Sequence, residues 1–160
     1  MKVSEYFQIE TIHFSEQTNQ TAVLCEMAEL LIKKGYVKES YQDAILKREK
    51  TFPTGLMTEF GGVALPHADS EHVLAPIVCI AKSKEPIYFH EMAVNDEIVP
   101  VHFIFMLALQ DPSEQLDMLQ FLIQMIQNEE VMDSIANSEQ ATEILDAIHA
   151  FSLIEKGDEN

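Results

Sequence analysis

The sequence is poor in basic residues. Its 160 residues include 10 Lys and Arg against 27 Asp and Glu, which gives a formal net charge of −17 at pH 7. Proteins that bind nucleic acid neutralise its phosphates with Lys and Arg side chains, so this composition argues against a nucleic-acid partner. A basic protein partner would instead be attracted and steered by the acidic surface.

Cysteine is scarce as well. The two cysteines, Cys25 and Cys79, lie far apart in apolar surroundings, with neither a C-x-x-C motif nor the spacing of metal ligands. Free cysteines are among the most frequently buried residues, so we expect two reduced, buried thiols. This pattern fits a cytoplasmic protein.

Long hydrophobic runs are also missing. The first ten residues, MKVSEYFQIE, contain no apolar signal core, and the longest apolar run covers only residues 99–109. A membrane-spanning helix needs about 20 apolar residues, so we expect no direct membrane insertion. Apolar residues nevertheless make up 47% of the chain, enough for a substantial core. We expect one domain over residues 1–155 and a flexible tail at 156–160.

Hydrophobic periodicity predicts strands and helices in an order typical of a sheet with helices packed on it. Residues 51–62 contain a proline and three glycines and are predicted to form a loop. The expected strands are 6–14, a short strand ending at 65–66, 73–82 and 99–109. The first expected helix runs from a cap at Ser15 to a stop at Gly35, and the second begins after Ser40. Later helices are expected over residues 111–127 and after a cap at Asn137 or Ser138.

The stretch FGGVALPHADSEH, residues 60–72, contains the strongest candidate for chemistry. Pro66 restricts its own backbone and favours an extended Leu65, so His67 is presented where a strand meets a loop. A neutral imidazole is a nucleophile when a hydrogen bond fixes the proton on its other nitrogen. Phosphoryl transfer to such a ring mainly requires positioning and a cation. Arg48, three residues after Ile45 on the buried stripe of its predicted helix, is the candidate cation.

Two motifs together resemble a known family. REKTFPTGL at 48–56, followed by GGVALPHADSEH at 61–72, is similar to the IIA component of the bacterial sugar phosphotransferase system (PTS). The resemblance is to the fructose/mannitol superfamily and is closest to its galactitol-type branch. It implies a single α/β domain with a mixed sheet of about five strands flanked by helices on both sides.

The resemblance also implies roles for individual residues. His67 would accept a phosphoryl group through Nε2 from phospho-HPr and pass it to a cysteine of the IIB component. Arg48 would stabilise the phosphate, and Thr54 and Gly55 would help to form the wall of the site. The sugar would be bound by a membrane permease, IIC, with which this cytoplasmic component would associate only transiently. No cofactor is implied.

One position departs from the family pattern. Several mannitol- and fructose-type members have a second site histidine in a Glu-His-Leu context, where this chain has Glu114, Gln115 and Leu116. Gln115 can donate a hydrogen bond to a phosphate but cannot become a cation. We therefore expect Gln115 to line the phosphate site and the chain to be galactitol-like.

Other interpretations remain open at this level. His67, Asp69 and His72, with Glu71 nearby, resemble a divalent metal site, but they lack a third strong ligand, and no metal is needed for phosphoryl transfer to histidine. A regulatory module could use the same phosphorylation to control a protein partner such as a transcription regulator. The transported sugar, the oligomeric state and the group that fixes the His67 tautomer are left undetermined by the sequence.

Overall fold

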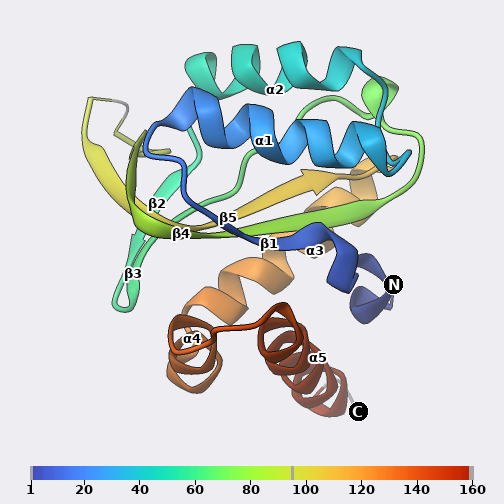
Figure 1. The fold of residues 1–160 in the computed structure, drawn as a ribbon. Coiled ribbons are helices and arrows are strands. Elements are labelled where there is room, and N and C mark those ends of the chain that lie inside the picture. The colour runs from blue at the N-terminus through green and yellow to red at the C-terminus, as the bar shows by residue number, and fades with distance from the viewer. Residues whose placement is uncertain (1, 95, 159–160) are drawn as a thin grey trace.

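The computed structural model describes residues 2–94 and 96–158, with side chains to residue 154, as a five-stranded sheet between two layers of helices (Figure 1). The strands are β1 (Ile12–Ser15), β2 (Gly55–Thr58), β3 (Gly61–Ala64), β4 (Ile77–His90) and β5 (Ile98–Ala108). The helices are α1 (Gln20–Lys33), α2 (Ser40–Thr51), α3 (Pro112–Ile126), α4 (Glu129–Ala136) and α5 (Ala141–Asp158). Short 3₁₀ helices cover Val3–Tyr6, Ile9–Thr11 and Ser70–His72.

The sheet is mixed, with the strand order β1-β4-β5-β3-β2. β1 runs parallel to β4 and β3 parallel to β5, whereas β4 and β5, and β2 and β3, are antiparallel pairs. Helices α1 and α2 cover one face, and α3, α4 and α5 cover the other (Figure 1). The expected α/β architecture is confirmed.

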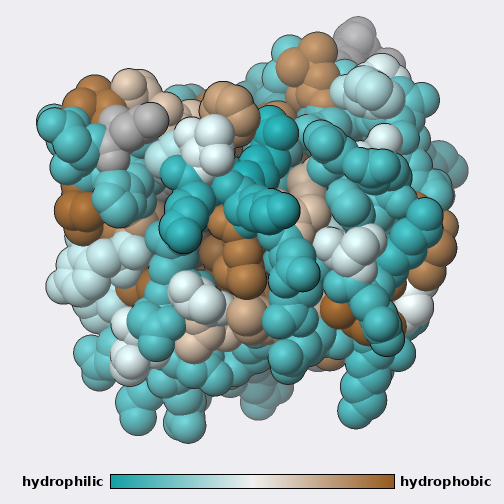
Figure 2. Space-filling view, turned by 90° about the horizontal axis from the view of Figure 1, so that it is seen from above, coloured by the Kyte–Doolittle hydropathy of each residue, from teal (hydrophilic) through white to brown (hydrophobic). Residues whose placement is uncertain are grey.

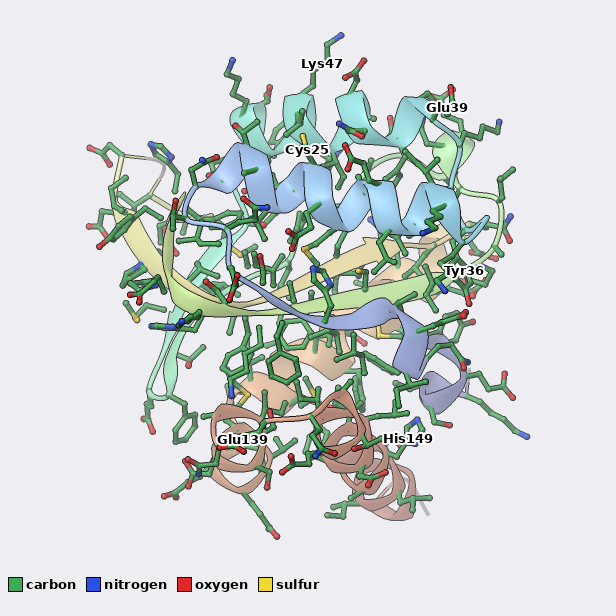
Figure 3. All side chains as sticks on the ribbon, in the orientation of Figure 1. Cys25, Tyr36, Glu39, Lys47, Glu139 and His149 are labelled. Carbon is green, nitrogen blue, oxygen red and sulfur yellow. The ribbon has the colours of Figure 1, made fainter. Side chains whose placement is uncertain are left out.

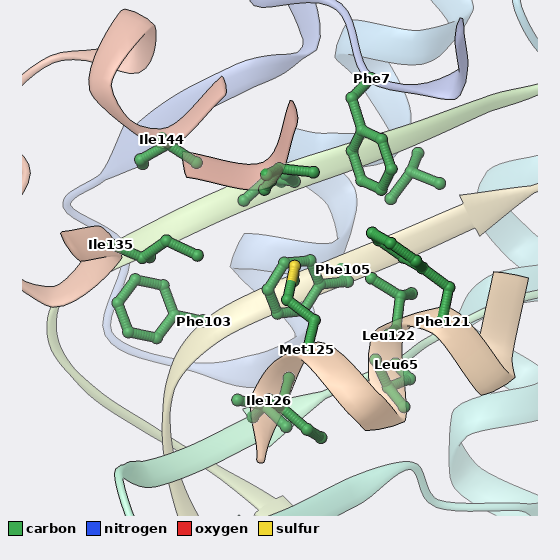
Figure 4. Packing of buried hydrophobic residues seen from close by; sticks show 14 of the residues in the cluster. Phe7, Leu65, Phe103, Phe105, Phe121, Leu122, Met125, Ile126, Ile135 and Ile144 are labelled. Carbon is green, nitrogen blue, oxygen red and sulfur yellow. The ribbon is translucent and has the colours of Figure 1, made fainter. Parts of the chain in front are cut away.

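Each face of the sheet has its own hydrophobic core. Under α1 and α2, alternate residues of β4 and β5 pack against buried side chains of both helices. On the opposite face, Phe103 and Phe105 of β5 lie among side chains of α3, α4 and α5 (Figure 4). Leu65 belongs to this second core, where it lies beside Leu122 of α3 (Figure 4). The central strands are therefore buried by helices on both faces.

The N-terminal prediction was wrong in its boundaries. In the expected strand 6–14, residues 12–14 belong to β1, but the part before Ile12 contains the end of one 3₁₀ turn and the whole of another. The first helix is capped not by Ser15 but by Asn19, whose side chain accepts a hydrogen bond from the Ala22 amide at 2.8 Å. The stop at Gly35 is confirmed, because this glycine takes a φ of 83° after the helix.

The predicted loop 51–62 was also wrong in part. It contains β2 and the turn of a β-hairpin, in which Gly61 has a φ of 114°. Gly62 and Gly55 pack against neighbouring backbone, since a Cβ atom at these positions would lie 2.1 Å from the Pro100 oxygen and 2.6 Å from the His90 oxygen. The glycines that suggested a loop thus permit close strand packing.

The C-terminal part contains three helices. Asn137 ends α4, and α5 starts at Ala141, later than the predicted cap. Of the predicted tail 156–160, residues up to Asp158 belong to α5, and residues 159–160 lie outside the described part of the chain. Within the described ranges, no helix has the length and apolar character needed to span a bilayer.

Candidate functional site

His67 lies just beyond the end of β3, where the chain still follows the sheet. The Leu107 amide of β5 donates to the Pro66 carbonyl at 2.9 Å, and His67 forms an isolated parallel bridge with Leu107. The Leu107 carbonyl in turn accepts a 2.7 Å hydrogen bond from the Tyr41 hydroxyl of α2. The backbone at His67 is therefore held by β5, and Tyr41 of α2 holds this part of β5 in turn.

The His67 ring is oriented by its own backbone segment. Nδ1 lies 3.0 Å from the Leu65 carbonyl oxygen, which can only accept a hydrogen bond. The proton is therefore on Nδ1, and Nε2 keeps its lone pair. This main-chain oxygen is the group that fixes the tautomer, which the sequence had left open.

Burial lowers the pKa of His67 below its ordinary value of 6.5, and the nearby Arg48 charge lowers it further. The hydrogen bond to Leu65 and the Asp69 carboxylate act in the opposite direction, but the net shift is downward. The ring is consequently neutral at pH 7, the state in which Nε2 can act as a nucleophile.

An NMR titration tests this charge state. We expect the His67 ring to titrate below pH 6.5 because the folded protein disfavours the imidazolium. The resonance is identified by its loss in His67→Gln, and a titration midpoint at or above 6.5 contradicts the expectation.

Arg48 lies in the last turn of α2, close to His67, and its guanidinium makes only weak contacts with its neighbours. Nη1 is 3.9 Å from Asp69 Oδ1, at the limit of an ion pair, and the Asp69 side chain is 76% exposed. The guanidinium carbon lies 5.2 Å from the centroid of the Phe52 ring. Among the described residues, the buried Nε finds no hydrogen-bond acceptor. Arg48 therefore has donors available for an incoming anion.

The buried stripe of α2 ends at a different residue from the one predicted. The stripe contains Tyr41, Ile45 and Glu49, spaced by four residues, whereas the Arg48 side chain is 36% exposed. Glu49 accepts hydrogen bonds from both the amide and the hydroxyl of Thr54, each at 2.7 Å. Burial raises the pKa of Glu49 to about 7, against the opposing influence of these hydrogen bonds and of Arg48. The i, i+4, i+8 spacing could have revealed this carboxylate.

The other predicted wall residues occupy structural positions. Thr54 is buried, and its hydroxyl also accepts the Leu65 amide hydrogen at 3.1 Å. Gly55 packs on the His90 backbone, as described above. Gln115 lies half-buried in the first turn of α3, and no side-chain hydrogen bond joins it to His67 among the described residues. Their contact with a bound phosphate stays a prediction.

An open cleft of about 280 Å³ runs beside α2, between this helix and the loop that follows His67. Lys47, Arg48 and Phe52 line it from the helix side, and Asp69 and His72 from the loop side. The face over α1 and α2 is mainly hydrophilic, with a hydrophobic patch near its centre (Figure 2). Lys47 extends from the outer side of α2, away from the sheet (Figure 3). The cleft beside Arg48 is thus open to the surface.

The sequence had also suggested a metal site around His67, Asp69 and His72. His72 Nδ1 instead forms a 2.8 Å hydrogen bond with the Ser40 hydroxyl. Within the described part of the chain, no group of three His, Cys, Asp or Glu side chains is arranged to hold a metal ion.

Comparison with known proteins identifies a family model and several relatives of the chain. A family model described as "Phosphoenolpyruvate-dependent sugar phosphotransferase system, EIIA 2" matches residues 5–150. The chain is 26% identical over 117 residues to the galactitol-specific EIIA component of Escherichia coli K12, which covers 73% of this chain and 77% of that protein. It is 27% identical over 101 residues to the transcriptional regulator ManR of Bacillus subtilis, which covers 63% of this chain and 14% of the regulator.

Solved structures agree with this result. The crystal structure of IIA mannitol from Escherichia coli is 26% identical, with a TM-score of 0.72 over 88% of this chain and 97% of that one. The complex of IIAMTL with phosphorylated enzyme IIBMTL from the same organism has a TM-score of 0.73 at 24% identity, covering 90% of this chain and 99% of that one.

Proposed function

The chain belongs to the EIIA 2 family of the phosphoenolpyruvate-dependent sugar phosphotransferase system, and we propose that it carries the phosphoryl group on Nε2 of His67. The observation that supports this most directly is the hydrogen bond from Nδ1 to the Leu65 carbonyl, at 3.0 Å. It holds the ring as the neutral tautomer whose Nε2 is free to attack phosphorus.

The proposed reaction consists of two displacements at phosphorus. The Nε2 lone pair of His67 forms a bond to the phosphorus of phospho-HPr, while the donor's own P–N bond breaks and its electron pair returns to the donor histidine. The thiolate of a IIB cysteine then attacks the same phosphorus, and the electron pair of the broken bond returns to Nε2. The Nδ1 proton stays on the ring throughout and donates to the Leu65 carbonyl.

Arg48 supplies the positive charge for this reaction. The transferring phosphoryl group spreads its negative charge over three oxygens, which a guanidinium matches geometrically. The long ion pair to an exposed Asp69 and the unpartnered Nε leave Arg48 ready to turn toward such a group. Thr54, Gly55 and Gln115 stay proposed as residues that shape the surroundings of the phosphate.

The surroundings of the site suit protein partners. The cleft beside α2 is open, and the side chain of Phe52 at its edge is 60% exposed. The excess of acidic residues would attract a basic donor and accelerate a transient encounter. We propose phospho-HPr as donor and a IIB component as acceptor, acting in the cytoplasm beside a IIC permease. The IIAMTL–IIBMTL complex provides a precedent for the acceptor.

A galactitol-like sugar is the finer part of the proposal. It is supported by the similarity to a galactitol-specific EIIA component and by Gln115 at the position of the second histidine. The sugar itself would contact IIC, so the specificity of this chain would lie in the IIB surface that it recognises.

Transfer assays with purified components test the function. We expect phospho-HPr to label the protein stoichiometrically with an acid-labile phosphate, because phosphohistidine hydrolyses in acid. The labelled protein should then transfer this phosphate to a galactitol-type IIB faster than to a mannitol-type IIB. Faster transfer to the mannitol-type protein would overturn the sugar branch, and absence of labelling would overturn the carrier function.

A regulatory role is the second candidate. It is suggested by the match to the transcriptional regulator ManR, in which a segment similar to this chain forms a small part of a larger regulatory protein. A regulatory module would accept the phosphate from phospho-HPr but would not donate it to any IIB cysteine. Retention of the label with every IIB tested would therefore favour this role over transport.

A further inference from the structure

Glu49 is a buried carboxylate that the phosphoryl-transfer steps do not use. It is only 4% exposed, and both of its oxygens accept hydrogen bonds from one residue, Thr54. Burying a carboxylate is costly unless hydrogen bonds compensate, so a residue that merely fills space at this position of α2 would be apolar. The position next to Arg48 suggests a task connected with the site.

The hydrogen bonds continue from Thr54 to the segment that carries the histidine. The Leu65 amide donates to both the hydroxyl and the carbonyl of Thr54, at 3.1 and 3.3 Å. The carbonyl of the same Leu65 accepts the proton of His67 Nδ1. Four groups therefore form one continuous path, from the Glu49 carboxylate through Thr54 and the Leu65 peptide groups to the His67 ring.

The direction of the Leu65 carbonyl depends on this path. Its amide is held by Thr54, its side chain is buried beside Leu122 (Figure 4), and Pro66 restricts its backbone from the following position. Of these three restraints, only the bond to Thr54 links the strand end to α2. The same helical turn carries Arg48, so Glu49 fixes the end of α2 from which Arg48 extends relative to the strand end that carries the histidine.

We propose that Glu49 is a positioning residue, which acts through Thr54 and Leu65 to hold His67 in its Nδ1-protonated tautomer and in register with Arg48. The proposal rests on the proposed function for its rate effect but not for its effect on the ring. Glu49 itself would not touch the phosphate. Its contribution is to keep the acceptor carbonyl of Leu65 and the helix end that carries Arg48 in place before the donor arrives.

The variants Glu49→Gln and Thr54→Val test the path. Glutamine offers one acceptor oxygen where the carboxylate offers two, and valine removes the hydroxyl that bridges to the Leu65 amide. Thr54→Ser restores the hydroxyl and serves as the conservative variant. Asp43→Asn is the matched control, because Asp43 is an exposed carboxylate on the same helix.

The first readout is the tautomer of His67 in the unphosphorylated protein, measured from the ring ¹⁵N shifts. We expect Glu49→Gln and Thr54→Val to increase the fraction protonated on Nε2, while Thr54→Ser and Asp43→Asn keep the native ratio. This measurement does not require that the protein be a phosphoryl carrier. Unchanged ring shifts in both Glu49→Gln and Thr54→Val would overturn the proposal.

The second readout is phosphorylation by phospho-HPr. We expect kcat to fall about tenfold in Glu49→Gln and Thr54→Val, with KM nearly unchanged because the docking surface is intact. Thr54→Ser should recover most of the rate. A loss of kcat that Thr54→Ser does not recover, or one that accompanies unaltered ring shifts, would overturn the positioning role. If the wild type takes no phosphate, the proposed function fails, and the ring shifts still decide the role of Glu49.

Discussion

Replacement of His67 by glutamine is expected to abolish phosphorylation by phospho-HPr. Glutamine keeps a polar side chain of similar reach, but its amide nitrogen has no lone pair available for attack on phosphorus. The loss should be complete within detection, because the phosphoryl group has no other covalent attachment point in the proposed reaction. Radiolabel incorporation into the purified protein measures it.

A matched control separates chemistry from folding in this experiment. His90 is an exposed histidine at the end of β4, and His90→Gln should take up label like the wild type. Both variants should unfold near the wild-type temperature, since His67 contributes one ring hydrogen bond to the fold. Stoichiometric labelling of a folded His67→Gln protein would disprove the assignment of the acceptor.

Replacement of Arg48 by alanine should reduce the rate of phosphorylation by about 100-fold or more. Removing one preorganised group that stabilises transition-state charge typically costs this much. Arg48→Lys should recover only part of the rate, because an ammonium keeps the charge but not the two-pronged geometry. Single-turnover kinetics with phospho-HPr measure both variants, and the loss should fall on kcat rather than on KM.

The control for Arg48 must remove a cation without touching the site. Lys33 is an exposed cation in the last turn of α1, so Lys33→Ala changes the net charge equally and should leave kcat unchanged. A similar decrease in both variants would mean that Arg48 acts through net charge alone. A rate for Arg48→Ala within threefold of the wild type would remove it from the mechanism.

The position of His67 at the end of a strand could be predicted because its signals are local. Pro66 directs the backbone of its neighbours, and an apolar run before it predicts a strand, so the position of the ring follows from adjacent residues. The helix that begins at Ser40 and contains Arg48 was predicted by the same kind of short-range pattern. The strand end and the helix are found where they were expected, but the Arg48 side chain lies beside the buried stripe rather than on it.

The partners of these residues could not be read in the same way. The acceptor for His67 Nδ1 is the carbonyl of Leu65, and a main-chain atom has no signature in a sequence. The spacing of α2 could have placed Glu49 on the buried stripe, but its hydrogen-bond donor, Thr54, lies beyond the end of the helix and has no signal in that spacing. β2 was missed because Gly55, shortly after Pro53, indicates a turn when its close packing on the His90 backbone is unknown.

The weak tie between Arg48 and Asp69 has a consequence for how firmly the phosphoryl group is kept. A guanidinium bound firmly to the phosphate would lower the free energy of the phosphorylated protein, and the phosphoryl group would then be transferred onward slowly. The largely exposed Asp69, whose Oδ1 lies 3.9 Å from Arg48 Nη1, offers the guanidinium a weak alternative ion pair. In the proposed reaction, a return of Arg48 to Asp69 would keep the stabilisation of the phosphorylated form small, and the transfer potential of the phosphoryl group would stay available to the acceptor.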